Sequence, residues 1–280
     1  ARSSSHCFSL RAMRFNCAEI ALEVEVTGVG DPVLIIHGFT GCGSAMAPLA
    51  KLLSGRRILP DLVGHGRSES PVALDPYALT SISSQLSSLL QQLDASPASI
   101  IGYSLGGRIA LTFALSHPEM VKSLALIGAS PGISNQQERD LRFKQDCTLG
   151  DSISQVGVRN FVDTWVAMPM WESLRNSLTP QQWQDSIKQR AANHPLGLAN
   201  SLRASGTGAM SPLHETLQHL AAPTLLLVGE EDSKFLNIAK EMASTIPEAN
   251  IEVIRDSGHA THLEQPGATA DAIMKHFSCS

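Results

Sequence analysis

The sequence predicts an α/β protein with a mostly parallel sheet, helices on both of its faces and an inserted helical cap. Two observations lead to this prediction. Short apolar runs of strand length alternate with amphipathic patterns of helix length along most of the 280-residue chain. One long stretch, residues 130–223, carries helical patterns only. Such an alternation is typical of parallel strands joined by crossover helices.

Seven segments have the pattern of a strand. The first, Ala21–Thr27, alternates apolar residues with glutamates, which indicates a half-exposed strand. The others are short runs rich in Val, Ile and Leu, as in strands buried on both faces. They are Val33–Ile36, Ile58–Asp61, Ala98–Tyr103, Ser123–Ile127, Thr224–Val228 and Asn250–Ile254. Helical patterns lie between them, at Ala45–Leu53, Leu79–Leu93, Ile109–Leu115, Leu236–Ile246 and Ala268–Phe277.

The stretch at 130–223 is interpreted as a cap inserted into the α/β core. A reactive site at the ends of the strands needs a cover that excludes water, which favours a cap over ordinary surface helices. Its helical patterns span 136–147, 158–168, 172–178, 180–193 and 196–205. Residues 18–129 and 224–280 then form the core. Residues 1–17 are a lead or linker, with a first edge strand as the alternative.

Composition excludes several classes of function. Hydrophobic residues make up 43% of the chain and charged residues 17%, as in ordinary soluble globular proteins. A net charge of −5 offers no basic surface for nucleic acid. No apolar run approaches the roughly 20 residues that a membrane span needs. The five scattered cysteines form no C-x-x-C pair, which indicates neither a zinc site nor a disulfide framework and fits a reducing compartment.

The most informative motif is Gly102-Tyr103-Ser104-Leu105-Gly106, a G-x-S-x-G sequence between a predicted strand and a predicted helix. The glycines let the backbone turn sharply, so that the hydroxyl of Ser104 stands clear of the sheet. A serine hydroxyl is a weak base and nucleophile at neutral pH. It needs an imidazole within hydrogen-bond reach and an acid that orients the imidazole.

The last two predicted strands supply candidates for that acid and imidazole. We assign Asp232 as the acid, since a residue a few positions out on a loop has the better reach, and His259 as the base. Both follow the carboxyl end of a strand, where open α/β sheets place their sites, and the chain order serine, acid, histidine fits this type of elbow. Glu230, Glu231 and Asp256 are competing acids, and His262 is interpreted as structural.

Two backbone N–H groups are candidates for an oxyanion hole. One belongs to Leu105, directly after the serine. The other belongs to Phe39, in the segment His37-Gly38-Phe39-Thr40-Gly41 that follows an early buried strand. His37 itself is interpreted as a structural hydrogen-bonding residue.

The arginines of the sequence indicate that the site binds an anionic ligand. Arg108 follows Ser104 by one helical turn, and a guanidinium matches a carboxylate bidentately whereas lysine does not. Any single arginine of the cap is best explained as solvated surface. Several arginines near one pocket, together with tryptophans close by in the sequence, favour a small polyanionic substrate. The residues concerned are Arg139, Arg142, Arg190, Arg203, Trp165 and Trp171.

These motifs resemble the α/β-hydrolase superfamily over nearly the whole chain. More narrowly, they are similar to the MenH-type 2-succinyl-6-hydroxy-2,4-cyclohexadiene-1-carboxylate (SHCHC) synthases of menaquinone and phylloquinone biosynthesis. HGFTG at 37–41 and G-x-S-x-G are common to the superfamily, so the specific part of the resemblance lies elsewhere. It lies in GYSLGGR at 102–108, in the DSKF run of GEEDSKF at 229–235, and in the cap motifs SPGISNQQER–LR at 130–142, FVDTW–P at 161–169 and LANSLRASGTG at 198–208. The motif GHATHLEQP at 258–266 also belongs to the resemblance.

The resemblance implies the α/β-hydrolase fold and a set of site residues. The Ser–Asp–His triad of such synthases falls on Ser104, Asp232 and His259. Their substrate-binding residues fall on Tyr103, Arg108, Arg142, Trp165 and Arg190.

The implied reaction is that of a carbon–oxygen lyase, the 2,5-elimination of pyruvate from 2-succinyl-5-enolpyruvyl-6-hydroxy-3-cyclohexene-1-carboxylate. Ser104, activated by His259, would take the ring proton next to the ketone as general base. The developing enolate would lie against the amides of Phe39 and Leu105. No metal and no cofactor is implied. The alternatives are a serine esterase or carbon–carbon bond hydrolase with the same triad, and a binding module on a decayed hydrolase fold, because fold does not fix function.

The first residues of the chain bear on whether it is part of a longer protein. The chain does not start with methionine, and its lead is longer than a free-standing bacterial enzyme needs. These features point to the C-terminal domain of a fused plant enzyme of phylloquinone biosynthesis, attached to other enzymes of the same pathway. We therefore expect a soluble protein, in the chloroplast if the source is a plant and otherwise in the cytoplasm.

Overall fold

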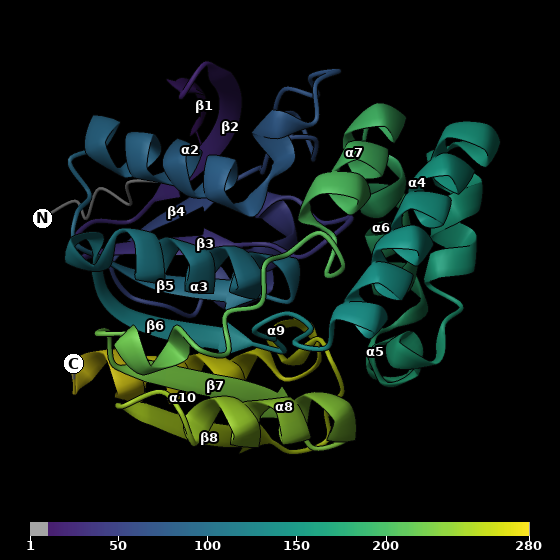
Figure 1. Ribbon diagram of the computed structural model, residues 1–280. Coiled ribbons are helices and arrows are strands. Elements are labelled where there is room, and N and C mark those ends of the chain that lie inside the picture. Colours follow the sequence, from purple (N-terminus) through teal and green to yellow (C-terminus); the bar gives the residue numbers. More distant parts are fainter. Residues whose placement is uncertain (1–10, 280) are drawn as a thin grey trace, which may run out of the picture.

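One sheet of eight strands runs through residues 11–279, the part of the chain that the computed structural model describes (Figure 1). The strands lie in the order β1-β2-β4-β3-β5-β6-β7-β8. β1 pairs antiparallel with β2, and β2 with β4, while every other neighbouring pair is parallel. The strands are β1 (Arg11–Cys17), β2 (Ile20–Thr27), β3 (Pro32–Ile36), β4 (Arg56–Pro60), β5 (Ala98–Tyr103), β6 (Val121–Ile127), β7 (Thr224–Gly229) and β8 (Ala249–Ile254). The sheet confirms the predicted α/β class.

The seven predicted strands are all present. β3, β5, β6 and β7 are almost entirely buried, as expected of runs of Val, Ile and Leu in a sheet covered on both faces. β8 corrects the burial expected of its run: it lies at the edge of the sheet and only Ile254 is buried.

A further strand, β1, corrects the lead or linker that was predicted over residues 1–17. Residues 1–10 lie outside the described part, but Arg11–Cys17 form β1 along the edge of the sheet. Cys17 is fully buried and Phe15 packs against the core, so alternate side chains of β1 face inward. The edge-strand alternative therefore holds for residues 11–17.

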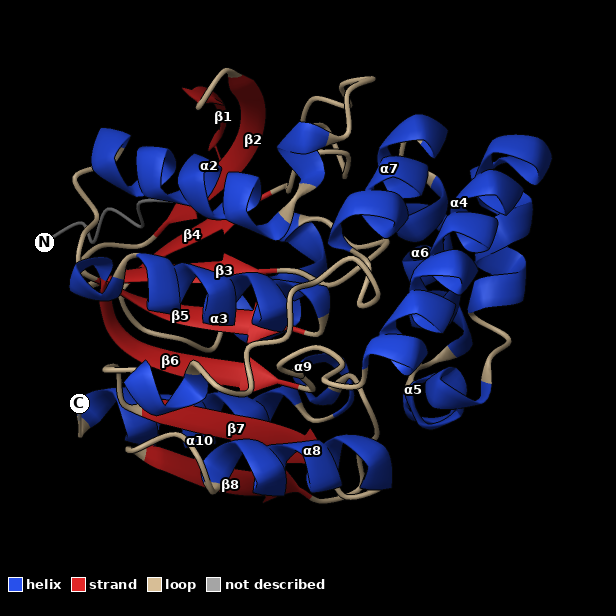
Figure 2. Cartoon of the chain, in the orientation of Figure 1, coloured by secondary structure: helices blue, strands red, loops and turns tan. Residues whose placement is uncertain are grey.

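Helices cover both faces of the sheet (Figure 2). α2 (Leu79–Gln92), α3 (Leu105–Ser116) and α8 (Ser233–Ala243) share one apolar core with the sheet, and α1 (Ala47–Ala50), α9 (Thr261–Glu264) and α10 (Pro266–Ser278) belong to a second core on the other face. The helix predicted at Ala45–Leu53 is shorter than expected. It comprises a 3₁₀ turn, Gly43–Met46, and the four residues of α1, since the turn through Gly55 into β4 follows closely.

Four helices lie between β6 and β7, beyond the carboxyl ends of the parallel strands (Figure 1). They are α4 (Gln136–Trp165), α5 (Glu172–Ser177), α6 (Pro180–Ala191) and α7 (Pro195–Ser205). All of residues 128–223 are described, and none of them is in a strand. α4, α6 and α7 share an apolar core of their own, whereas Leu174 of α5 packs into the second core of the sheet. The core of the three helices is built from Ile153, Val158, Phe161, Val162, Val166, Ile187, Leu198, Ala199 and Leu202.

The two helices predicted at 136–147 and 158–168 are joined into α4, which is interrupted at Gly157. The backbone of Gly157 has φ = 78° and ψ = 160°, a conformation essentially restricted to glycine. Within residues 11–279, no helix combines the length and the apolar character that crossing a bilayer requires.

Candidate active site

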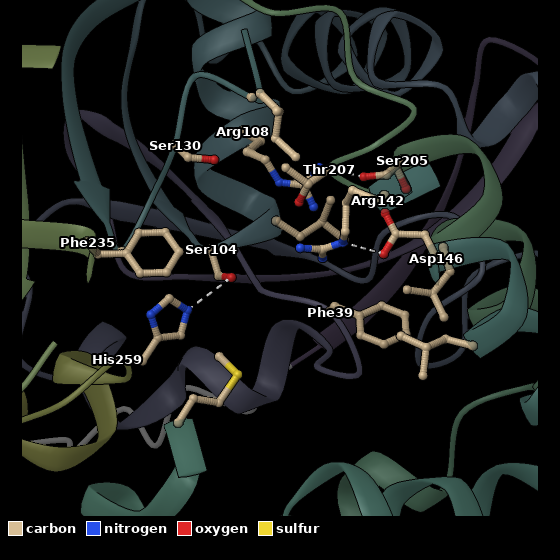
Figure 3. A pocket seen from close by; sticks show the side chains of 18 of the residues that line it. Phe39, Ser104, Arg108, Ser130, Arg142, Asp146, Ser205, Thr207, Phe235 and His259 are labelled. Carbon is tan, nitrogen blue, oxygen red and sulfur yellow. Dashed lines mark hydrogen bonds and ion pairs between the residues drawn. The ribbon is translucent and has the colours of Figure 1, made fainter. Parts of the chain in front are cut away.

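Ser104 lies in the turn between β5 and α3, where the sequence predicts a sharp bend. Its backbone has φ = 52° and ψ = −107°, which a residue with a side chain rarely adopts. The turn is fixed by a hydrogen bond from the Ser104 N–H to the carbonyl of Ile127, at 2.8 Å. It also requires glycine at 106, because a Cβ there would overlap the carbonyl oxygen of Ile36. The hydroxyl of Ser104 faces the cavity described below (Figure 3).

The structure brings Ser104, His259 and Asp232 together from three separate loops. His259 Nε2 lies 3.2 Å from Ser104 Oγ, and His259 Nδ1 lies 2.7 Å from Asp232 Oδ2. A carboxylate only accepts hydrogen bonds, so Nδ1 carries the proton and Nε2 is left to accept one from the serine. Of the competing acids, Glu230 accepts a hydrogen bond from the backbone N–H of Asp256. The carboxylate that bonds His259 is that of Asp232.

A second carboxylate, which the sequence analysis did not identify, holds the loop that carries His259. Glu264 accepts hydrogen bonds from the N–H groups of Gly258 and Ala260, at 2.8 and 3.0 Å, and from the hydroxyl of Ser173 at 2.5 Å. It thereby fixes the backbone on both sides of His259. The sequence contained a signal for this role. Glu264 follows Ala260 by four residues, about one helical turn, so its carboxylate can accept the free N–H groups at the start of a short helix.

The two candidate oxyanion donors, Phe39 and Leu105, both line the same cavity as Ser104. Leu105 is the first residue of α3, where N–H groups have no partner within the helix. The segment of Phe39 is held by His37, whose Nε2 accepts the N–H of Leu62 at 3.0 Å and whose Nδ1 donates to the carbonyl of Gly38 at 2.8 Å. His37 therefore has the structural role expected of it.

The cavity lies between the carboxyl ends of the strands and helices α4 and α7, with a volume of about 420 Å³. Its aromatic wall includes three of the predicted residues, Phe39, Tyr103 and Trp165. Its charged lining consists of three cations and one carboxylate: Arg108, Arg142, Lys234 and Asp146. The cavity is thus net positive in a chain whose formal net charge is −5. Such a chamber suits an anionic ligand.

Arg108 points into this cavity from α3 (Figure 3). Its Nη1 donates to the carbonyl of Ser205 at 2.6 Å, and within residues 11–279 it forms no ion pair with a carboxylate. Burial, and to a lesser extent the nearby Arg142, lowers the pKa of Arg108 to about 10, which still leaves it charged at neutral pH. The side chain of Arg108 is half-buried, and a partly desolvated cation without a carboxylate partner is costly unless a ligand supplies the negative charge.

Arg142 is held in place by a residue that the sequence analysis missed. Its Nε donates to Asp146 Oδ1 at 2.8 Å, and Asp146 Oδ2 accepts the N–H of Gly208 at 3.1 Å (Figure 3). The side chain of Asp146 is fully buried. Asp146 therefore orients Arg142 through Nε and leaves the terminal NH₂ groups for the cavity. The i, i+4 spacing of the two residues on a predicted helix was the available signal.

Arg190, the third predicted arginine, is not among the residues that line the cavity. It is buried behind the wall, where its guanidinium lies 4.6 Å from the ring centre of Trp171 and its Nη1 donates to Thr40 Oγ1 at 2.6 Å. Arg139 and Arg203, for which solvated surface was the simpler explanation, also lie outside the lining. The structure thus brings two of the three predicted substrate-binding arginines to Ser104.

Three buried histidines near the site predict a pH-dependent stability. Burial lowers the pKa of His37 from 6.5 to about 4, and those of His65 and His262 to about 3. Between pH 6.5 and 4 the unfolded chain binds protons at these positions and the folded chain does not. The free energy of unfolding should therefore fall as the pH is lowered, by about 1.4 kcal/mol per pH unit for each histidine.

Urea unfolding at several pH values checks this expectation. In His262→Gln the slope of unfolding free energy against pH should be smaller by about 1.4 kcal/mol per pH unit. The variant His219→Gln is the control, because His219 is exposed. Equal slopes for the wild type and His262→Gln would contradict a neutral His262.

Comparison with known proteins relates the chain to one enzyme family by sequence and by structure. Residues 31–266 match the family described as alpha/beta hydrolase fold. A Yersinia pestis protein named 2-succinyl-6-hydroxy-2,4-cyclohexadiene-1-carboxylate synthase is 32% identical, over 88% of this chain and 86% of its own length. Protein PHYLLO, chloroplastic, of Arabidopsis thaliana is 30% identical over 91% of this chain, which spans 16% of that protein. MenH from S. aureus superposes with a TM-score of 0.85 and 28% identity, covering 91% of this chain and 97% of its own.

Proposed function

Because the chain belongs to the SHCHC synthases of the α/β-hydrolase fold, we propose that it catalyses the elimination of pyruvate from 2-succinyl-5-enolpyruvyl-6-hydroxy-3-cyclohexene-1-carboxylate. The enzyme would thereby serve the biosynthesis of menaquinone or phylloquinone. The observation that carries this proposal is the meeting of Ser104, Arg108 and Arg142 in one cavity. An enzyme for neutral esters has no use for a half-buried guanidinium that faces the cavity and pairs with no carboxylate of residues 11–279.

In the proposed mechanism Ser104 and His259 act together as the base. Ser104 Oγ takes the ring proton next to the ketone while its own proton passes to His259 Nε2, and Asp232 stabilises the imidazolium. The electron pair of the broken C–H bond moves through an enolate to form the second ring double bond. The bond from ring carbon to the enolpyruvyl oxygen breaks, and the leaving group takes a proton and is released as pyruvate.

The remaining predicted residues have proposed roles in binding. The amides of Phe39 and Leu105 would stabilise the enolate oxygen as its charge develops. Arg108 and Arg142 would each hold a carboxylate, so that the reacting proton is aligned with Ser104. Tyr103 and Trp165 would form the wall against the ring. For Arg190 the structure favours an indirect role, in which it supports the wall through Trp171 and Thr40.

The test is to supply the enolpyruvyl substrate and follow pyruvate release with a coupled lactate dehydrogenase assay. We expect turnover of this substrate and negligible hydrolysis of p-nitrophenyl acetate. Rapid ester hydrolysis without pyruvate release would instead support the alternative of a serine esterase. Cleavage of a carbon–carbon bond, without pyruvate, would support the related hydrolase.

The match to PHYLLO supports one further proposal, that this unit acts within a longer chloroplast protein alongside other enzymes of its pathway. The bacterial relatives support a separate enzyme of the cytoplasm instead. An immunoblot of the source tissue with antibody to this chain distinguishes the two, because a fusion would migrate far above the 29.9 kDa of the present chain.

A further inference from the structure

Lys234 is a cation of the cavity that the roles above leave unexplained. It is the second residue of α8, directly beyond the turn that carries Asp232, and it lines the cavity together with Ser104 and the two arginines. Its side chain is exposed at the mouth. Nζ lies 5.5 Å from the ring centre of Phe235, and that ring lies 4.5 Å from the ring of His259. The ammonium group is therefore on the histidine side of the site.

The position of Lys234 is not explained by the stability of the protein. A positive charge in the first turn of a helix opposes the helix dipole and costs a few tenths of a kcal/mol or more. No carboxylate compensates for it, since within residues 11–279 Lys234 forms no ion pair. Lys234 stabilises neither its helix nor a neighbouring acid, and it faces a cavity. Binding of an anionic ligand explains its position best.

The arrangement of cations matches the shape of the proposed substrate. Arg108 and Arg142 lie on one side of Ser104, and Phe235, which neighbours Lys234, lies on the other (Figure 3). A substrate with three carboxylates would span Ser104 and leave one carboxylate on the Phe235 side. Arg190 is buried behind Trp171 and is not in the lining on that side. The lining offers one other cation, Lys234.

We propose that Lys234 binds the third carboxylate of the substrate at the mouth of the cavity and so selects tricarboxylates over dicarboxylates. This inference rests on the proposed function. Lysine suits the place because a flexible point charge at an exposed rim can follow a ligand as it enters, whereas the buried end needs the rigid fork of arginine.

The experiment compares Lys234→Gln with Lys240→Gln in the pyruvate assay. Lys240 is exposed on the same helix, α8, but does not line the cavity, so it controls for the loss of one surface charge. Lys234→Gln should raise KM about fivefold with little change in kcat, the loss expected for one exposed ion pair. Lys234→Arg should restore KM to within about twofold of the wild type, because the charge is kept.

A salt series separates binding from a structural effect. The KM of the wild type should rise with ionic strength, and the slope of log KM against log ionic strength should be smaller in Lys234→Gln but unchanged in Lys240→Gln. Equal KM values and slopes for all three proteins would overturn the role of Lys234 while leaving the proposed function intact. Absence of pyruvate release by the wild type would overturn the proposed function itself.

Discussion

Replacing Ser104 with alanine is expected to lower kcat for pyruvate release about 10³-fold, because the hydroxyl that we propose as the base, bonded to His259, is then missing. Substrate binding should persist, since the arginines and the aromatic wall are untouched. The measurement combines steady-state kinetics with a titration of substrate that follows the fluorescence of Trp165 and Trp171, which line the cavity.

Ser116→Ala is the matched control, since Ser116 is exposed at the far end of α3, the helix that follows Ser104. It should leave both kcat and affinity unchanged. If Ser104→Ala kept more than about a tenth of the wild-type kcat, the serine would not be the base. His259 acting through water would then be the better mechanism.

Replacing Arg108 with glutamine is expected to lower kcat/KM about 10²- to 10³-fold, because a carboxylate of the substrate inside the cavity would lose its cation. The loss should exceed that of Arg142→Gln. Arg142 is 38% exposed in its side chain and shares its charge with Asp146, so its interaction with a ligand is better screened. Arg108→Lys should recover only part of the loss, since the charge remains but the bidentate geometry does not.

The stability of Arg108→Gln distinguishes a binding role from damage to the fold. Arg108 is half-buried and pairs with no carboxylate in the described part of the chain, so removing its charge should leave the melting temperature unchanged or raise it. A lower melting temperature together with a general loss of activity would mean that Arg108 serves mainly to hold the carbonyl of Ser205. An unchanged kcat/KM would contradict the anionic substrate.

The sequence alone determined the class of the fold and the residues at the bend. Alternating apolar runs and helical patterns are local properties, and a sheet covered on both faces is the arrangement that buries those runs. Glycines on both sides of Ser104 are needed wherever a serine stands in so tight a turn, so the elbow was also visible locally. The sequence did not decide between a lead and an edge strand at β1, because the alternation of apolar and polar residues there is short and includes Arg11 and Arg14.

Only the tertiary structure decided which charged side chains share a cavity. The family resemblance grouped Arg108, Arg142 and Arg190 as substrate-binding residues, but the packing of α6 against the loop of Thr40 places Arg190 behind Trp171. Lys234 belongs to the segment that supplied Asp232 and had no predicted role, yet it lines the cavity. The physical reason is that a pattern of residues fixes the face of a helix on which a side chain lies, whereas the neighbour that this face meets depends on how distant helices pack.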